Sequence, residues 1–265
     1  MSLLNIIVCL KQIPDPEGPV TSYSVDQEAK KMKITGIPPV VNPFDENALE
    51  AALKLKDQNG AKVTILSMGE RLSKPVLIKA LGTGADDLIL LEDAGFNELD
   101  SKSTAYVLAA AIKKIGDFHI ILVGRQAGDW DFGQTGVLLA HTLGIPMINL
   151  AVDIGAEENG VKVKRLKRNG YEVVKAPMPV VIGADSQIGA LRYPSMKALM
   201  AAKKIKPKTW KSDALALDQS KLIPRKLDQL NPPPSRLRQC AFIDGDSPQD
   251  KGQDLAIRLR KDGII

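Results

Sequence analysis

Residues 118–146 read FHIILVGRQAGDWDFGQTGVLLAHTLGIP, and this stretch decides the fold. The first six residues, Phe118 to Val123, form the short apolar run that is typical of a buried strand. A loop rich in glycine and aspartate follows, and the pattern then predicts a helix from about Gly133 to Leu143, ended by Gly144 and Pro146. A strand, a glycine-rich loop and a helix in this order indicate one unit of an α/β sheet.

The same alternation fills the N-terminal half of the chain. A helix is predicted between Asn42 and Gly60, because Asn42 suits the N-cap, Pro43 suits the first helical position and Gly60 suits the end. Further strands are predicted at 3–10, 62–67 and 88–91, and further helices at 75–81 and 101–115, while 11–41 is a long polar connection. We therefore expect an α/β fold with an open, doubly wound, mostly parallel sheet, Rossmann-like and adenine-nucleotide-binding.

The pattern changes after residue 160. Residues 161–165 and 171–174 predict a hairpin whose Asn169-Gly170 pair favours a tight primed turn. A buried strand at 179–183 and a basic helix at 195–203 follow. From residue 205 the chain is rich in Pro, Lys and Asp, and helical periodicity returns only at 248–260, with Ser247 as the N-cap.

Two domains are therefore expected. Residues 1–204 form the α/β nucleotide-binding domain, and 205–265 form a C-terminal arm. A tail of about sixty residues cannot make a core of its own, so we expect it to pack on another subunit. A disordered extension is the alternative.

Charge is unevenly distributed. Residues 161–211 hold thirteen lysines and arginines against two acids, a net +11 in a chain of net +5. We expect one strongly basic face, which either meets acidic protein partners or is solvated. Nucleic acid is disfavoured because few aromatic residues accompany the charge. The sequence shows no signal peptide or membrane-spanning run, and its two cysteines, Cys9 and Cys240, suit a reducing cytoplasm.

Motifs for catalysis are missing. The sequence holds no phosphate-binding Walker A motif, no nucleophile elbow and no Cys/His cluster with metal-ligand spacing. Residues 82–87 resemble a dinucleotide fingerprint, but they follow a helix instead of a strand, so we interpret them as a turn. His119 and His141 have no candidate nucleophile beside them. We expect no catalytic residue and no metal site.

A binding site is predicted where parallel strands end. The end of the first strand at Cys9, the helix start at Asn42 and the loop 124–136 should meet there. Loop glycines let backbone amides approach a phosphate, Arg125 adds charge, and Gln134 and Thr135 stand at a helix start. This arrangement favours an adenine-nucleotide pocket, with an ordinary capped loop as the alternative.

Four segments, in order, resemble the beta subunit of electron transfer flavoproteins. They are VCLKQIPD at 8–15, NPFD at 42–45, the loop from Gly124 to Gly136, and ALRY at 190–193 before a lysine-rich helix. The similarity runs over nearly the whole chain. Coincidence is disfavoured because all four occur in register.

The resemblance implies a heterodimer that carries electrons and is not an enzyme by itself. The alpha subunit holds a redox-active FAD, and this chain binds AMP or the AMP part of a second FAD. The dehydrogenase partners implied are flavoproteins of the acyl-CoA dehydrogenase type, as in fatty acid oxidation. The positions that match the family's nucleotide site are Cys9, Asn42, Pro43, Phe44, Asp45, Met68, Gly124, Arg125, Gln126, Ala127, Gly128, Asp129, Trp130, Asp131, Phe132, Gly133, Gln134 and Thr135.

A second segment resembles the loop by which the family grips its dehydrogenases. It spans 191–206, and Met196 occupies the position of the apolar anchor. Its implied partner-binding residues are Arg192, Tyr193, Met196, Lys197, Lys203 and Lys204. The alternative is that Met196 is a core residue of a surface helix. The arm at 205–265 likewise resembles an extension that wraps around the alpha subunit.

Departures from the family leave the second nucleotide open. Residues 129–136 read DWDFGQTG, which matches neither DGDTAQVG of electron-bifurcating members nor DDDCNQTG of many simple carriers. Pro16 stands where some relatives have an aromatic residue. We favour AMP, with a bifurcating form that uses NADH as one alternative. For the function as a whole, the alternatives to an electron carrier are a stand-alone adenine-nucleotide sensor and a nucleotide-cleaving enzyme.

Overall fold

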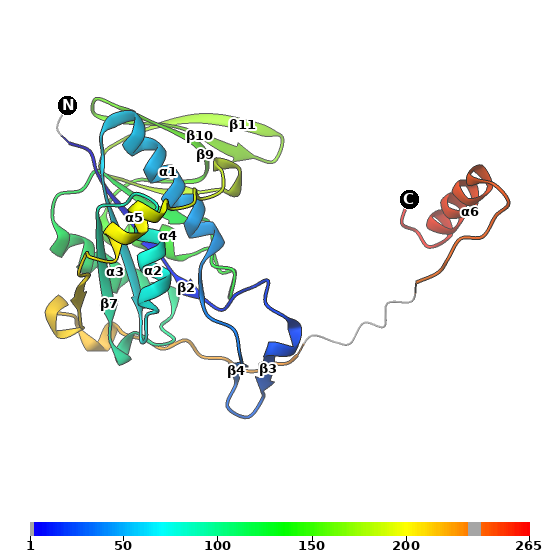
Figure 1. Ribbon diagram of the computed structural model, residues 1–265, viewed down its shortest axis with the longest axis horizontal. Coiled ribbons are helices and arrows are strands. Elements are labelled where there is room, and N and C mark those ends of the chain that lie inside the picture. The colour runs from blue at the N-terminus through cyan, green and yellow to red at the C-terminus, as the bar shows by residue number, and fades with distance from the viewer. Residues whose placement is uncertain (1–2, 233–239) are drawn as a thin grey trace. The chain divides into compact units, whose positions relative to one another are not determined.

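A computed structural model describes residues 3–232 and 240–265 and divides the chain into two compact units, Met1–Gln229 and Leu230–Ile265. The strands are β1 (Asn5–Leu10), β2 (Gln12–Ile13), β3 (Tyr23–Asp26), β4 (Lys31–Ile34), β5 (Val40–Val41), β6 (Lys62–Gly69), β7 (Asp87–Glu92), β8 (Ile120–Gly124), β9 (Met147–Glu157), β10 (Gly160–Lys167), β11 (Gly170–Pro177), β12 (Val180–Ala184) and β13 (Lys208–Trp210). The α-helices are α1 (Pro43–Asn59), α2 (Lys74–Leu81), α3 (Ser101–Ile115), α4 (Thr135–Leu143), α5 (Met196–Ala202) and α6 (Pro248–Lys261). Figure 1 shows their arrangement.

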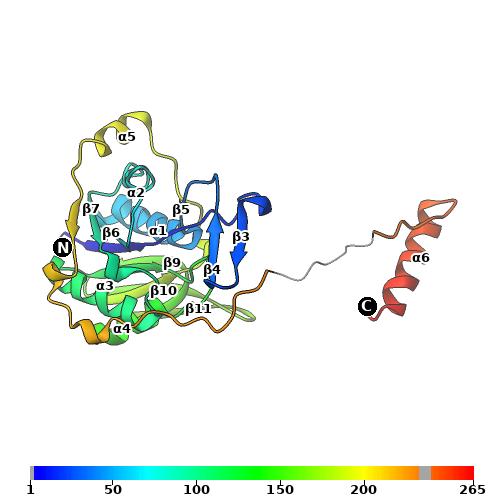
Figure 2. The same ribbon diagram turned by 90° about the horizontal axis from the view of Figure 1, so that it is seen from below.

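A nine-stranded sheet organises the first unit, in the order β11-β10-β9-β12-β8-β1-β6-β7-β13. In this order, every pair of neighbours from β9 onward to β13 is parallel, while β10 pairs antiparallel with both β9 and β11. Helices α1 and α2 cover one face, and α3 and α4 cover the other (Figure 2). The predicted doubly wound α/β fold is confirmed.

The strand order reverses beside β1. From β1 the chain moves to β6 and β7 on one side, and then returns to β8 on the other. Because the connecting helices leave this point on opposite faces, a crevice opens at the carboxyl ends of β1 and β8. The candidate site lies here.

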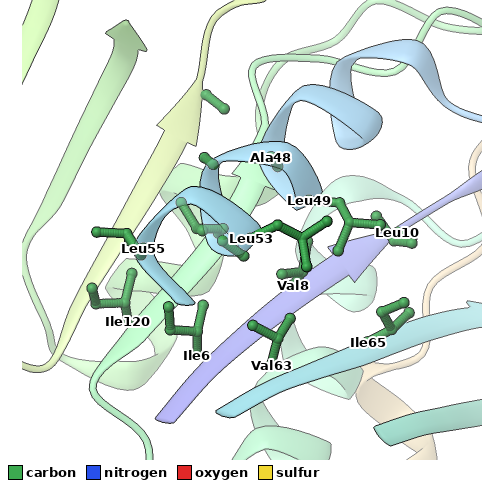
Figure 3. Close-up of a cluster of buried hydrophobic side chains, with 14 of the residues drawn as sticks. Ile6, Val8, Leu10, Ala48, Leu49, Leu53, Leu55, Val63, Ile65 and Ile120 are labelled. Atoms are coloured by element: carbon green, nitrogen blue, oxygen red, sulfur yellow. The ribbon is translucent and has the colours of Figure 1, made fainter. Parts of the chain in front are cut away.

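The core between α1 and the sheet fixes this geometry. Leu49 and Leu53 of α1 are buried over Val8 of β1 (Figure 3). Each large aliphatic side chain buried in this way stabilises the fold by about 1.5–3 kcal/mol. Because helices cover both faces, the central strands read as continuous apolar runs without alternation.

Helix ends follow the predicted signals. Gly60 and Gly144 end α1 and α4 in the left-handed conformation, with φ of 72° and 70°. Ser195 Oγ accepts the backbone N–H of Ala198 (3.1 Å) at the start of α5. Ser247 begins α6 with a capping box completed by Asp250.

Several strands were not predicted. The connection 11–41 holds the β2–β5 pair and the β3–β4 hairpin, and β9 is an eleven-residue strand. Strand β4 carries the sequence KMKI with every residue exposed, so no apolar alternation marks it. The hairpin of β10 and β11 is confirmed, but its expected turn is wrong. Lys167 pairs with Gly170, so Arg168 and Asn169 occupy the central positions in place of Asn169 and Gly170.

The compact domain extends beyond the expected boundary at residue 204. Strand β13 adds to the edge of the sheet beside β7, and Pro224 forms a bridge with Leu99. Residues 205–229, assigned to the arm from sequence, therefore belong to the first unit. Strand β13 was not predicted because it has only three residues in a stretch of lysines and prolines, where no apolar periodicity is visible. Within the second unit, α6 has no buried residue, and Leu255 and Ile257 are exposed.

The expected single basic face is wrong. The basic stretch 161–211 begins in β10 and β11 at one edge of the sheet and ends in β13 at the opposite edge. Between them, β12 returns to the centre of the sheet and α5 packs against α2. In the part of the chain that the structure describes, no helix is both long and apolar enough to cross a membrane.

Candidate functional site

A cavity of about 600 Å³ lies at the carboxyl ends of β1, β6 and β8, where the strand order reverses. Its size falls within the range of roughly 300–1,000 Å³ that is usual for small-molecule sites. Most of the predicted nucleotide-site residues line it. They are Cys9, Asn42, Asp45, Met68, Gly124, Arg125, Gln126, Ala127, Asp129, Trp130, Phe132, Gly133, Gln134 and Thr135.

Four predicted residues do not line the cavity in this structure. Pro43 is exposed at the first position of α1. Phe44 lies under the Arg125 guanidinium, 4.9 Å from Cζ to the ring centroid. Gly128 and Asp131 act within the loop, since the Gly128 N–H donates to Asn42 Oδ1 (3.1 Å) and Asp131 Oδ1 accepts from Gln126 Nε2 (2.8 Å). Phe44, Gly128 and Asp131 thus contact residues that line the cavity.

Asn42 connects α1 to the loop 124–136. It occupies the N-cap position as predicted, but its side chain makes no capping hydrogen bond. Instead, Nδ2 donates to the Gln126 carbonyl (2.8 Å), while Oδ1 accepts from Gly128. The side chain is almost fully buried, with 1% exposed. It therefore fixes the shape of the loop, and an apolar replacement would leave buried backbone groups without partners.

Asp45 ties together the two strands that border the site. Its Oδ2 accepts the backbone N–H of Lys11 (2.7 Å), after β1, and its Oδ1 accepts that of Gly124 (3.0 Å), at the end of β8. Burial raises the pKa of Asp45 to about 7, against the lowering effect of these hydrogen bonds. The carboxyl group therefore positions backbone and is not free to bind a ligand.

Gly124 allows α1 to approach the end of β8. A Cβ at this position would lie 2.5 Å from Asp45 Oδ1 and 2.6 Å from the backbone carbon of Phe44. Real Cβ atoms do not approach backbone so closely, so only glycine fits. Gly124, at the start of the loop, is therefore needed for the packing of α1 against the end of β8.

The first turn of α4 faces the cavity with open amides. The helix begins at Thr135, two residues later than predicted, and Gln134 in the N-cap position makes no side-chain capping bond. Gln134, Thr135 and Gly136 all line the cavity. Unsatisfied N–H groups and the positive end of a helix favour an anion such as a phosphate.

Arg125 is already paired in this structure. Its Nη1 lies 3.1 Å from Oδ2 of Asp185, a side chain with 2% exposed. Its Nε is buried and has no partner within the described residues. The predicted positive charge is therefore partly neutralised.

The loop tip brings aromatic groups to the cavity. Asp129 forms an ion pair with Lys11 (Nζ to Oδ2, 2.6 Å), which anchors the loop to the end of β1. The rings of Trp130 and Phe132 lie 6.0 Å apart between centroids, with a tilted geometry. These rings provide flat apolar surface of the kind on which a base or a ring system stacks.

Nothing at the site indicates a catalytic group. Burial, with a smaller effect of the Asp45 charge, raises the pKa of the Cys9 thiol to about 12, so it is not a nucleophile near neutral pH. His119 Nδ1 accepts the backbone N–H of Asn5 (3.0 Å), which is a structural role. Among the described residues, no group of His, Cys, Asp and Glu is arranged to hold a metal ion.

Sequence reasoning missed part of the cavity wall. Met32 and Ile34 of β4, Ser101 and Thr104 of α3, and Arg225 also line it. These residues come from distant segments without a recognisable motif, so only the folded chain brings them together.

The predicted partner segment 191–206 has a rigid start and an exposed middle. The Arg192 guanidinium donates to both carboxylate oxygens of buried Glu50 and also to Oδ2 of Asp57 (2.7 Å). Arg192 therefore anchors the segment, and its guanidinium is already paired within this chain. Met196 has 75% of its surface exposed, so the alternative of a core methionine is wrong. Tyr193, Lys197, Lys203 and Lys204 are also exposed.

Comparison with known proteins identifies the family. The sequence profile described as "Electron transfer flavoprotein domain" matches residues 33–215. The chain belongs to the electron transfer flavoprotein family. Members similar to it include "Electron transfer flavoprotein subunit beta" of Clostridium acetobutylicum, 37% identical over 83% of each chain. The protein of the same name in Megasphaera elsdenii is 38% identical over 88% of this chain and 89% of its own.

A third relative is named as a subunit of a reductase complex. It is "Caffeyl-CoA reductase-Etf complex subunit CarD" of Acetobacterium woodii, 34% identical over 81% of this chain and 80% of its own. The resemblance to beta subunits of this family is thus confirmed, and with it the role of an electron-carrier subunit that is not an enzyme. A beta subunit implies an alpha-subunit partner.

Proposed function

We propose that this chain pairs with an alpha subunit that holds a redox-active FAD, and that it binds AMP in the cavity at the end of β1 and β8. The electrons come from flavoproteins of the acyl-CoA dehydrogenase type. When bound, FAD supplies the redox chemistry, and this chain supplies scaffold, nucleotide site and docking segment. The two cysteines, which form no disulfide, fit the cytoplasmic location that we also propose.

The observation that carries the proposal is the open start of α4 beside a glycine-containing loop. A phosphate placed at Thr135 and Gly136 would meet unsatisfied amides and the helix dipole. Arg125, which lines the cavity, adds positive charge beside them. The donor set therefore fits the phosphate end of an adenine nucleotide, and Asn42 and Asp45 hold the surrounding backbone in place.

Docking of a dehydrogenase is proposed for the segment 191–206. Met196 is exposed and adaptable, and the nearby lysines offer positive charge to an acidic partner. The bond from Arg192 to Glu50 limits motion at the base of the segment. For the second unit, we propose that α6 packs on the alpha subunit through Leu255 and Ile257, which are exposed in this chain.

Counting of nucleotides tests the cofactor assignment. The chain is co-expressed with its alpha subunit, the heterodimer is denatured, and released FAD and AMP are separated by chromatography. One FAD and one AMP per heterodimer is the expected result. Absence of both nucleotides would overturn the proposal.

A second candidate is a bifurcating form with two FAD molecules. The cavity continues beyond the loop to apolar residues of β4 and to Phe96 and Leu99, which offers room and surface for a ring system. One relative bears the name of a caffeyl-CoA reductase-Etf complex. Two FAD and no AMP in the same count would favour this form.

The dehydrogenase is tested by reduction of the heterodimer. An acyl-CoA dehydrogenase with its substrate is mixed with oxidised heterodimer, and flavin absorbance is followed. We expect bleaching that slows at least tenfold when Met196 is replaced by Glu, because a charge then enters an apolar contact. The control is Val173→Glu, an exposed apolar residue on β11 outside the cavity and the docking segment. Equal rates for wild type and Met196→Glu would exclude this docking surface.

A further inference from the structure

A segment from the first unit runs past the cavity and delivers an arginine to it. Residues 221–227, here called the strap, follow β13 and pass α3 toward the β3–β4 hairpin (Figure 1, Figure 2). Before Arg225, Ser103 Oγ donates to the Lys221 carbonyl (2.8 Å) and accepts the Ile223 N–H (2.9 Å), and the Asp100 N–H donates to the Ile223 carbonyl (3.0 Å). The Arg225 N–H itself donates to the Glu98 carbonyl (2.7 Å). After Arg225, Lys30 Nζ donates to the Leu227 carbonyl (3.0 Å). The strap is therefore held on both sides of Arg225.

Arg225 lies in the wall of the cavity, stacked on the loop. Its Cζ is 3.7 Å from the centroid of the Trp130 ring. Its Nε is buried and has no partner within the described residues. Arginine that stacks on an aromatic face keeps its N–H edge available for a planar, two-pronged contact.

The cations near the cavity differ in how they are neutralised. Arg125 is paired with Asp185, Lys11 is paired with Asp129, and the two other cations that line the cavity, Lys31 and Arg71, are exposed to solvent. Arg225 forms no ion pair with a residue in the part of the chain that the structure describes. A half-buried guanidinium without a counter-ion, in the wall of the cavity, is complementary to an anion in the adjacent space.

We propose that Arg225 is a further nucleotide-binding residue, which donates charge-assisted hydrogen bonds to a phosphate of the bound nucleotide. This inference rests on the proposed nucleotide site. Trp130 orients the guanidinium before the nucleotide binds, so little side-chain entropy is lost on binding. Nucleotide binding therefore also depends on a residue after β13, although the site is built mainly from β1, α1 and β8.

The test compares ligands with and without phosphate. The co-expressed heterodimer is stripped of AMP, and its dissociation constants for AMP and adenosine are measured by calorimetry. Arg225→Gln should weaken AMP binding about 10- to 100-fold, as expected for loss of a charged hydrogen bond, and change adenosine binding less than twofold. Arg225→Lys should lie between, because it keeps the charge and loses the planar edge. Lys226→Gln, an exposed neighbour on the strap, is the matched control.

Each possible result either supports the role of Arg225 in phosphate binding or overturns it. An equal loss for AMP and adenosine would mean that Arg225 only closes the cavity, and unchanged AMP affinity in Arg225→Gln would likewise overturn the inference. If the wild type binds no nucleotide at all, the proposed function fails first, which is distinguishable from failure of the variant alone. If the site holds FAD instead, FAD and riboflavin replace AMP and adenosine. A melting temperature within about 2 °C of wild type confirms that each variant is folded.

Discussion

Replacement of Gly124 by alanine tests whether the contact between β8 and α1 shapes the site. The new Cβ would lie 2.5 Å from Asp45 Oδ1, 2.6 Å from the Phe44 backbone carbon and 2.8 Å from the Asp45 backbone nitrogen. Two of these atoms are backbone, so the strand and helix must move apart. Such overpacking costs about 1–3 kcal/mol. Distortion of the bond from the Gly124 N–H to buried Asp45 adds about 1–3 kcal/mol.

We therefore expect a loss of about 3 kcal/mol, which lowers the melting temperature by about 6–12 °C for a domain of this size. The assay is thermal unfolding of the co-expressed heterodimer, with bound AMP counted in parallel. AMP content should also fall, since Gly124 begins the loop that lines the cavity. Gly155→Ala is the control, because its Cβ would meet only Lys162 O at 3.7 Å. Gly124→Ala that melts within about 2 °C of the control would refute the reasoning.

Three further predictions concern charged and titrating groups. Glu50→Gln should destabilise the heterodimer by about 1–3 kcal/mol in thermal unfolding and slow reduction by the dehydrogenase, because Arg192 loses its buried partner; unchanged values in both assays would contradict this. Iodoacetamide at pH 8 should label Cys240 and spare Cys9, whose pKa of about 12 leaves about one thiolate in ten thousand, and labelling at Cys9 in the peptide map would contradict it. Burial raises the pKa of Asp45 from 3.8 to about 7, so the folded state binds the proton more tightly and stability falls as pH rises through this window. The advantage of wild type over Asp45→Asn in urea unfolding should therefore shrink by about 3 kcal/mol between pH 5 and pH 8, and a growing advantage would oppose it.

The parallel core was predictable from sequence because its signals are local. Helix α3 has the bounds 101–115 that its apolar spacing predicts, and Gly60 and Gly144 end their helices as expected. Such signals depend on neighbours a few residues apart, and tertiary contacts reinforce them here. The short strands β4 and β13 lack them, because pairing partners distant in sequence decide their conformation.

The site was predictable in position and only partly in roles. Residue types at strand ends placed Asn42, Asp45 and the loop 124–136 together, as the structure confirms. The direction of each side chain was not predictable, since Asn42 bonds the loop in place of its helix and Arg192 bonds Glu50 in place of a partner. Arg225 was missed because it lies ninety-five residues from Trp130 in sequence and no spacing rule joins them.

The most direct test of the central claim is a crystal structure of the co-expressed heterodimer with its bound nucleotides. The account predicts an adenine nucleotide in the cavity of this chain, with phosphate oxygens within hydrogen-bond distance of the amides of Thr135 and Gly136 at the start of α4. A nucleotide that sits elsewhere, with this cavity filled only by water, would contradict it.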